Sequence, residues 1–159
     1  MQKPGPADIQ RLALLIEAEA IQLREFIDHL GREEALLVSG DTDGLLALTT
    51  AKTERYRQLQ RLHDDRALLL GRLCLANKDA SIRQLCTHLP RVLARWDEVI
   101  ELAGKARDRN ALNGKLINER MQHNQAALSV LLAAANHPQL YDADGQSRPT
   151  GGGRILGSA

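Results

Sequence analysis

Two apolar stripes in the first half of the chain match each other when one of them is read backwards, and this match most constrains the fold. Steps of three and four residues, typical of one helix face, predict a helix capped by Asp8 and running to about residue 39, and a second over residues 45–75. The first stripe comprises Ile9, Leu12, Ile16, Leu23, Phe26, Leu30 and Leu37. The second comprises Leu45, Leu48, Leu59, Leu62, Leu69 and Leu73. An antiparallel hairpin brings the stripes together when paired position numbers add to 85, and its midpoint falls in the turn-forming segment 39–44.

Charged residues that interrupt the two stripes support the same register. Glu19 is paired with Arg66 and Glu33 with Lys52, and both pairs again add to 85. Desolvation offsets much of the attraction in such pairs, so they add little stability, but a slipped register would separate them. The sequence therefore predicts that both pairs lie on the inner or flanking side of the hairpin.

The rest of the helical region comprises a short and a long predicted helix. Asp79 is the expected cap of a short helix over residues 80–89, whose role stays open, and the period resumes over residues 91–135. A break at Asn113–Gly114 is the alternative to one continuous helix, and packing is expected to be weakest over the polar positions 107–114. The predicted core stripe of the long helix comprises Leu93, Trp96, Ile100, Ala103, Arg107, Asn110, Gly114, Ile117, Met121, Asn124, Leu128, Leu131 and Ala135.

Composition agrees with an all-α fold. Leu and Ala fill 49 of the 159 positions, whereas the chain has only four aromatic residues and few β-branched ones. We expect an elongated helical bundle made of the hairpin, the short helix and the long helix, in one domain over residues 1–135. Residues 136–159 are Gly-rich and predict a flexible, disordered tail.

Charge and hydropathy exclude several classes of function. The net charge is +1, so no global field attracts nucleic acid or an anionic membrane, and the basic second helix complements the acidic first one. No apolar run is long enough to cross a membrane, and the first residues do not resemble a secretory signal. We therefore expect a cytoplasmic protein with no nucleic-acid partner and no membrane insertion.

A search for catalytic or metal-binding patterns finds only weak signals. Glu25 with His29 and Glu119 with His123 are spaced by four residues, whereas a di-iron bundle uses a spacing of three. His63-Asp64-Asp65 points in several directions on a helix, and the segment 151–154 lacks the context of a phosphate loop. Cys74 and Cys86 lack metal-ligand spacing and are expected to be reduced, buried or half-buried thiols. We expect no catalytic residue, metal or cofactor, and an enzyme is the least favoured class.

An uncharged run over residues 126–135 has more apolar faces than one core stripe needs. It predicts either a helix covered by its neighbours or by a second copy in a homodimer, or a docking surface for another protein's amphipathic helix. Under the docking interpretation the candidate partner-binding residues are Leu128, Val130, Leu131 and Leu132, extended by Leu140 and Tyr141.

The last third of the chain contains Trp96, Asn110-Ala-Leu-Asn113-Gly114-Lys-Leu-Ile117, Leu140-Tyr141-Asp142-Ala-Asp144-Gly145-Gln146 and a Gly-rich end, and the first half contains Glu33-Glu34-Ala35-Leu36 and the segment 43–52. This arrangement resembles the FlgN-type flagellar export chaperone family, and the resemblance spans nearly the whole chain. It implies a cytosolic helical chaperone of flagellar type III secretion. Such a chaperone binds C-terminal helices of the hook–filament junction proteins and delivers them to the export gate. By motif match Tyr141 is a candidate anchor at the gate, or else a tyrosine packed on its own helix end. The alternative function is a structural coiled-coil or adaptor protein that acts only by oligomerisation.

Overall fold

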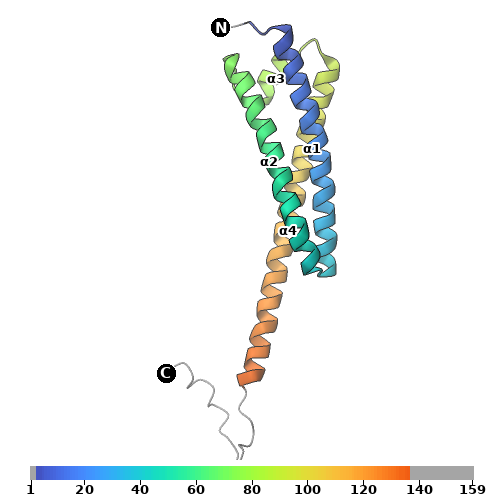
Figure 1. Cartoon of the computed structure of the whole chain (residues 1–159), viewed down its shortest axis with the longest axis vertical. Coiled ribbons are helices and arrows are strands. Elements are labelled where there is room, and N and C mark those ends of the chain that lie inside the picture. Colours follow the sequence, from blue (N-terminus) through green and yellow to red (C-terminus); the bar gives the residue numbers. More distant parts are fainter. Residues whose placement is uncertain (1–2, 137–159) are drawn as a thin grey trace, which may run out of the picture. The chain divides into compact units, whose positions relative to one another are not determined.

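The computed structural model describes residues 3–136, which form four helices and no strand (Figure 1). The helices are α1 (Pro6–Ser39), α2 (Thr42–Arg72), α3 (Asp79–Leu85) and α4 (Pro90–Asn136). The chain divides into two compact units, residues 1–116 and residues 117–159. The predicted all-α architecture of hairpin, short helix and long helix is confirmed. The predicted tail lies outside the described residues, apart from Asn136 at the end of α4, and the domain boundary after residue 135 stays a prediction.

The α1–α2 hairpin has the predicted antiparallel register. Arg66 donates a hydrogen bond from Nε to Glu19 Oε1 at 2.7 Å, and both side chains are buried. Nineteen positions apart in the chain, Lys52 Nζ donates to both carboxylate oxygens of Glu33 at 3.0 Å. Both charge pairs therefore form, which confirms that α1 and α2 pair as the sequence predicts.

Two glycines and one aspartate shape the turn between α1 and α2. Gly40 takes a left-handed conformation (φ 75°) at the end of α1, which a residue without a Cβ adopts at no steric cost. Gly44 donates its N–H to Asp41 Oδ1 at 2.9 Å, which caps the start of α2. A Cβ at Gly44 would lie 2.8 Å from the side chains of Leu36 and Asp41, so a larger residue there would require these side chains to shift.

The starts of α1 and α3 correct two predicted caps. Asp8 was expected to cap α1, but α1 begins at Pro6, and Asp8 accepts a hydrogen bond from Gly5 N at 3.0 Å from within the first turn. Asp79 is the first residue of α3 rather than its cap, and α3 ends at Leu85 instead of residue 89. The Asp79 carboxylate instead accepts a hydrogen bond from Trp96 Nε1 at 2.8 Å, which fastens α3 to α4.

The core of unit 1–116 is centred on α1, with α4 running parallel to it. Glu17 of α1 pairs with Arg95 of α4 at 2.6 Å, and Arg24 pairs with Glu98, so positions rise together along both helices. The buried residues of the main apolar cluster come from all four helices and the α3–α4 connection. They are Leu12, Leu15, Ile16, Ala20, Leu23, Phe26, Leu30, Leu69, Leu70, Ile82, Cys86, Trp96, Val99 and Ala106.

The buried face of α4 differs from the predicted stripe. Trp96 is buried as expected, but the next buried positions are Val99, Ala106 and Asn113, whereas Ile100 is 42% exposed. The rotation of α4 about its axis is explained by polar contacts. Asn113 Nδ2 donates hydrogen bonds to Leu30 O and to Glu33 Oε1, both at 2.9 Å. These bonds require the 99–106–113 face of α4 to lie against α1.

The helix α4 continues through Asn113–Gly114 without a break, as predicted. The expected weak packing holds for Arg107 and Asn110, which are exposed, but not for Asn113, which is 1% exposed. Beyond residue 116 the prediction of a core stripe is wrong in the single chain, because the large apolar side chains there are exposed. These are Ile117, Met121, Leu128 and Leu131. The side chain of Ala135 lies outside the described part.

The buried Glu19–Arg66 pair predicts a large loss of stability when its carboxylate is removed. We expect Glu19→Gln to lower the free energy of unfolding by about 3 kcal/mol, because Arg66 is left buried without its anion. The loss should lie at the lower end of the usual range, since Arg66 keeps Asn77 Oδ1 at 3.2 Å and the Trp96 ring at 4.7 Å. Glu54→Gln breaks an exposed pair with Arg57 and should cost about 0.5 kcal/mol or less in the same urea titration. Equal small losses would show that the Glu19–Arg66 pair is not buried in solution.

His29 predicts a pH dependence of stability near neutrality. Its side chain is buried with Nε2 3.1 Å from Leu48 O, and burial lowers the pKa of His29 below its ordinary value of 6.5. Nearby Arg55 and Lys52 lower this pKa further, while the Leu48 carbonyl and Glu33 oppose the shift. The unfolded chain therefore binds the proton more readily, so stability should fall as the pH drops through about 6.5.

The His29 contribution is measured from urea unfolding between about pH 7 and pH 5. His29→Gln should flatten the dependence, whereas the same change at exposed His88 should retain the wild-type slope. A wild-type slope in His29→Gln would assign the dependence to other groups.

Candidate partner-binding site

The candidate residues of the uncharged run are all exposed on the second half of α4. The exposed fractions are 57% for Leu128, 68% for Val130, 64% for Leu131 and 62% for Leu132. Leu128, Leu131 and Leu132 share one helix face, while Val130 lies on another. Leu140 and Tyr141 lie outside the described residues, so their part of the prediction is not tested.

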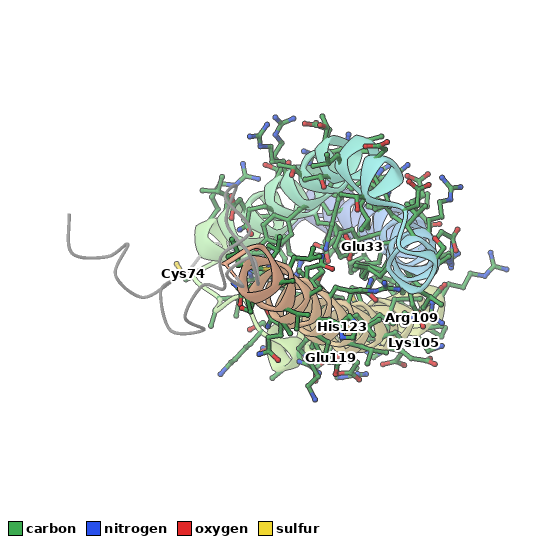
Figure 2. The ribbon with its side chains drawn as sticks, turned by 90° about the horizontal axis from the view of Figure 1, so that it is seen from below. Glu33, Cys74, Lys105, Arg109, Glu119 and His123 are labelled. Atoms are coloured by element: carbon green, nitrogen blue, oxygen red, sulfur yellow. The ribbon has the colours of Figure 1, made fainter. Side chains whose placement is uncertain are left out.

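Such an arrangement is suited to non-directional apolar recognition. Residues 126–134 contain no charged side chain, and Ser129 is the single hydroxyl among them. Large exposed apolar patches on soluble proteins are typical of interaction sites for proteins, membranes or ligands. Two ionisable residues nearer the start of α4, Glu119 and His123, are exposed as well (Figure 2). This segment can therefore bury apolar area against a partner. Residues 117–134 contain no cluster of His, Cys, Asp or Glu side chains that could hold a metal ion.

A second concave feature lies within unit 1–116. It is a solvent-open groove of about 440 Å³ between α2 and α4, with Leu23 and Phe26 of α1 in its floor. The α2 wall includes Tyr56, Leu59, His63 and Arg66. The α4 wall includes Trp96, Ile100, Ala103, Arg107 and Asn110. We name this feature the α2–α4 groove.

Sequence reasoning missed the α2–α4 groove, although its signal was present. Five of the seven residues that α4 contributes to the lining belong to the predicted core stripe. Two of those positions, Arg107 and Asn110, are polar, and Ala103 between them and Trp96 is small. A helix face on which a small apolar residue is followed by polar residues is poorly suited to a packed core. Such a face indicates a surface that the other helices of the same chain do not cover.

The groove is closed at one end by a polar cluster around Arg66. Besides its bond to Glu19, the Arg66 guanidinium lies 4.7 Å from the Trp96 ring centroid and 3.3 Å from His63 Nδ1. Asn77 Oδ1 accepts a further hydrogen bond from Arg66 Nη1 at 3.2 Å. Arg66 therefore ties α2 to α1, to α4 and to the segment before α3.

The side chains that could carry metal or acid–base chemistry are occupied or scattered. Glu25 pairs with Arg55 and His29 with the Leu48 carbonyl, so their i,i+4 spacing makes no site. In residues 3–136 no three His, Cys, Asp or Glu side chains are grouped to hold a metal ion. The predicted placement of the thiols holds for buried Cys86 but not for Cys74, which is exposed just after α2.

Burial raises the pKa of the Cys86 thiol, which makes it a poor nucleophile. Among the described helices, none has the length and apolar character needed to cross a membrane.

Comparison with known proteins gives a consistent family. The FlgN protein family model matches residues 1–149. The flagella synthesis protein FlgN of Yersinia enterocolitica serotype O:8 is 28% identical over 152 residues, which cover 94% of this chain and 95% of that protein. The protein of the same name from Salmonella typhimurium is 33% identical over 92 residues, covering 57% of this chain and 65% of that protein. No solved structure matches the chain significantly. Because the family match spans nearly all of the helical region, the chain belongs to the FlgN family.

Proposed function

We propose that this protein is a cytoplasmic chaperone of the flagellar type III export pathway. It binds the C-terminal helices of hook–filament junction proteins before export and delivers them to the export gate. Membership of the FlgN family supports a role in flagellar biogenesis, since its relatives are named flagella synthesis proteins. The chaperone role and the junction-protein clients are the finer part of the proposal, and a binding protein rather than an enzyme is what the described side chains favour.

The observation that carries the proposal is the exposed apolar end of α4. Leu128, Val130, Leu131 and Leu132 are each more than half exposed, in a run without charge. Full burial of one such side chain contributes about 1.5–3 kcal/mol, so the three leucines that share one face would supply about 4.5–9 kcal/mol before ordering costs. Micromolar affinity corresponds to about 8 kcal/mol, so this face would supply much of the energy for reversible binding of a client helix.

The mode of binding follows from the helical form of the surface. An amphipathic client helix would lay its apolar face along residues 128–132, with Leu140 and Tyr141 extending the contact. Binding through apolar area without charge pairs suits a carrier that must release its client. Tyr141 remains the candidate anchor at the export gate.

A structural adaptor that acts by oligomerisation is the second candidate function. The same exposed run favours it, because a second copy of α4 could cover the four side chains equally well. The two functions differ in whether the purified chain binds a junction protein or only itself.

Calorimetric titration with a purified C-terminal fragment of a junction protein tests the proposal. The double variant Leu128→Asp/Leu132→Asp should weaken binding by at least about 100-fold, because both charges lie on the same helix face and would be buried against an apolar helix. Its helicity and thermal unfolding should match wild type, since both positions are exposed. Leu14→Asp places the same charge at an exposed apolar position of α1 and should bind the fragment normally.

Three results would contradict this account. Unfolding of the double variant would show that the run is packed in solution. Unchanged affinity in a folded double variant would place the client elsewhere on the chain. Self-association of the wild type without any binding of the fragment would favour the adaptor.

A further inference from the structure

The α2–α4 groove exists because α2 is unevenly packed. The buried residues within α2 are Arg66, Leu69 and Leu70, all in its last two turns. By contrast, α1 is buried from Leu12 to Leu37. From residue 42 to residue 65, α2 therefore rests on α1 by half-buried leucines and ion pairs, and its side toward α4 is open at the groove.

The dimensions of the groove fit one short helix. Its α2 wall runs from Tyr56 to Arg66 and its α4 wall from Trp96 to Asn110. At 1.5 Å per residue these walls are about 15 Å and 21 Å long, the length of three to four helical turns. Tyr56 and Ile100 are 60% and 42% exposed, so apolar area is available on both walls. A further long helix placed there, beside the long helices α1, α2 and α4, would complete a bundle of the usual four-helix kind.

Charge indicates the chemistry of that helix. The core helix α1 carries seven acidic and three basic residues, a net charge of −4. Its two neighbours are basic: α2 and residues 90–116 of α4 each carry six basic and four acidic residues. Ion pairs join α1 to both of them, as with Glu25 to Arg55 of α2 and Glu17 to Arg95 of α4. Basic helices on either side of an acidic amphipathic helix are thus the packing rule of this bundle.

The basic helices α2 and α4 also border the groove, but no acidic helix of this chain occupies it. Among the lining residues Arg66 is already paired with Glu19, whereas Arg107 has no acidic partner within the lining. The ion pair recorded for Arg107 is with its own neighbour Asp108 at 3.9 Å, and both side chains are 81% exposed. An acidic side chain beside an apolar stripe would meet this cation at the wide end of the groove.

We propose that the α2–α4 groove binds an amphipathic, acidic helical segment of the exported client. The bound segment would pack beside the three long helices α1, α2 and α4. This rests on the proposed chaperone function and adds a second contact, independent of the exposed end of α4. A second copy of this chain matches less well. Its exposed run at residues 126–134 has no acidic residue, and its acidic helix α1 is buried in its own bundle. Lining side chains from three helices give the groove the shape specificity that the end of α4 lacks.

Filling the groove is the direct test, with the same junction-protein fragment as probe. Ala103 is exposed and lines the groove, so Ala103→Trp should weaken fragment binding by at least about tenfold by occupying the space. Ala111→Trp is the matched control, because Ala111 is exposed on α4 outside the groove lining, and it should bind as wild type does. Circular dichroism and urea midpoints verify that each variant is folded.

Replacing Arg107 by an acidic residue tests the predicted charge of the occupant. This second variant also tests the proposal if Ala103→Trp disturbs the fold. Arg107→Glu should weaken binding by about tenfold at low salt, and its affinity should vary less than that of wild type between about 50 and 500 mM salt. Arg91→Glu, at an exposed basic position outside the lining, should leave affinity within about twofold.

The outcomes separate this inference from the chaperone proposal. If wild type binds the fragment but Ala103→Trp binds equally well, the groove is not a client site, while the chaperone function stands. If the fragment does not bind wild type at all, both proposals fail. If Ala103→Trp weakens binding but Arg107→Glu does not, the occupant is not acidic and the proposal is wrong in its chemistry. If Ala103→Trp instead dissociates a dimer of the free chain without affecting the fragment, the occupant is a second copy and the proposal is overturned.

Discussion

One buried carboxylate, that of Glu33, connects three helices of the bundle. It accepts hydrogen bonds from Lys52 Nζ of α2 at 3.0 Å and from Asn113 Nδ2 of α4 at 2.9 Å. The Glu33 side chain points into the space between the helices (Figure 2). A carboxylate that is removed from water needs such partners, because an unpaired buried charge costs several kcal/mol. Satisfying Glu33 therefore fixes both the register of α2 and the rotational phase of α4 about its axis.

The phase of α4 determines which of its side chains are left for other uses. With Val99, Ala106 and Asn113 facing α1, the positions Ile100 and Ala103 turn toward the α2–α4 groove. At the other end of the bundle the Arg66 cluster joins α2 to α4 through the Trp96 ring. Between these two polar ties the bundle keeps an open apolar groove, which a core packed on the predicted stripe would have filled.

The sequence was sufficient for the hairpin because opposite charges at core positions can be paired by arithmetic alone. Glu19 with Arg66 and Glu33 with Lys52 agree on one register, and both pairs form in the structure. The phase of α4 could not be obtained this way. Asn113 appeared to be a turn signal beside Gly114, and its burial depends on Leu30 O and Glu33, which no periodicity reveals.

The apolar end of α4 gave two conflicting sequence signals. Its heptad positions predicted a core stripe, whereas its lack of charge on every face predicted a docking surface. The exposed side chains of residues 117–134 contradict the first prediction and leave the second as the basis of the proposed function. Periodicity shows which residues share a face, but it does not show whether the same chain supplies the neighbour that covers that face.

Residue-resolved hydrogen exchange, with and without the junction-protein fragment, tests most directly whether α4 combines a packed and an unpartnered part. In the free protein, backbone amides of residues 96–113 should exchange slowly and those of residues 117–134 much faster, because side-chain packing supports the first segment alone. Adding the fragment should slow exchange in residues 117–134. Equal protection of both segments in the free protein, or no change in residues 117–134 when the fragment is bound, would contradict the account.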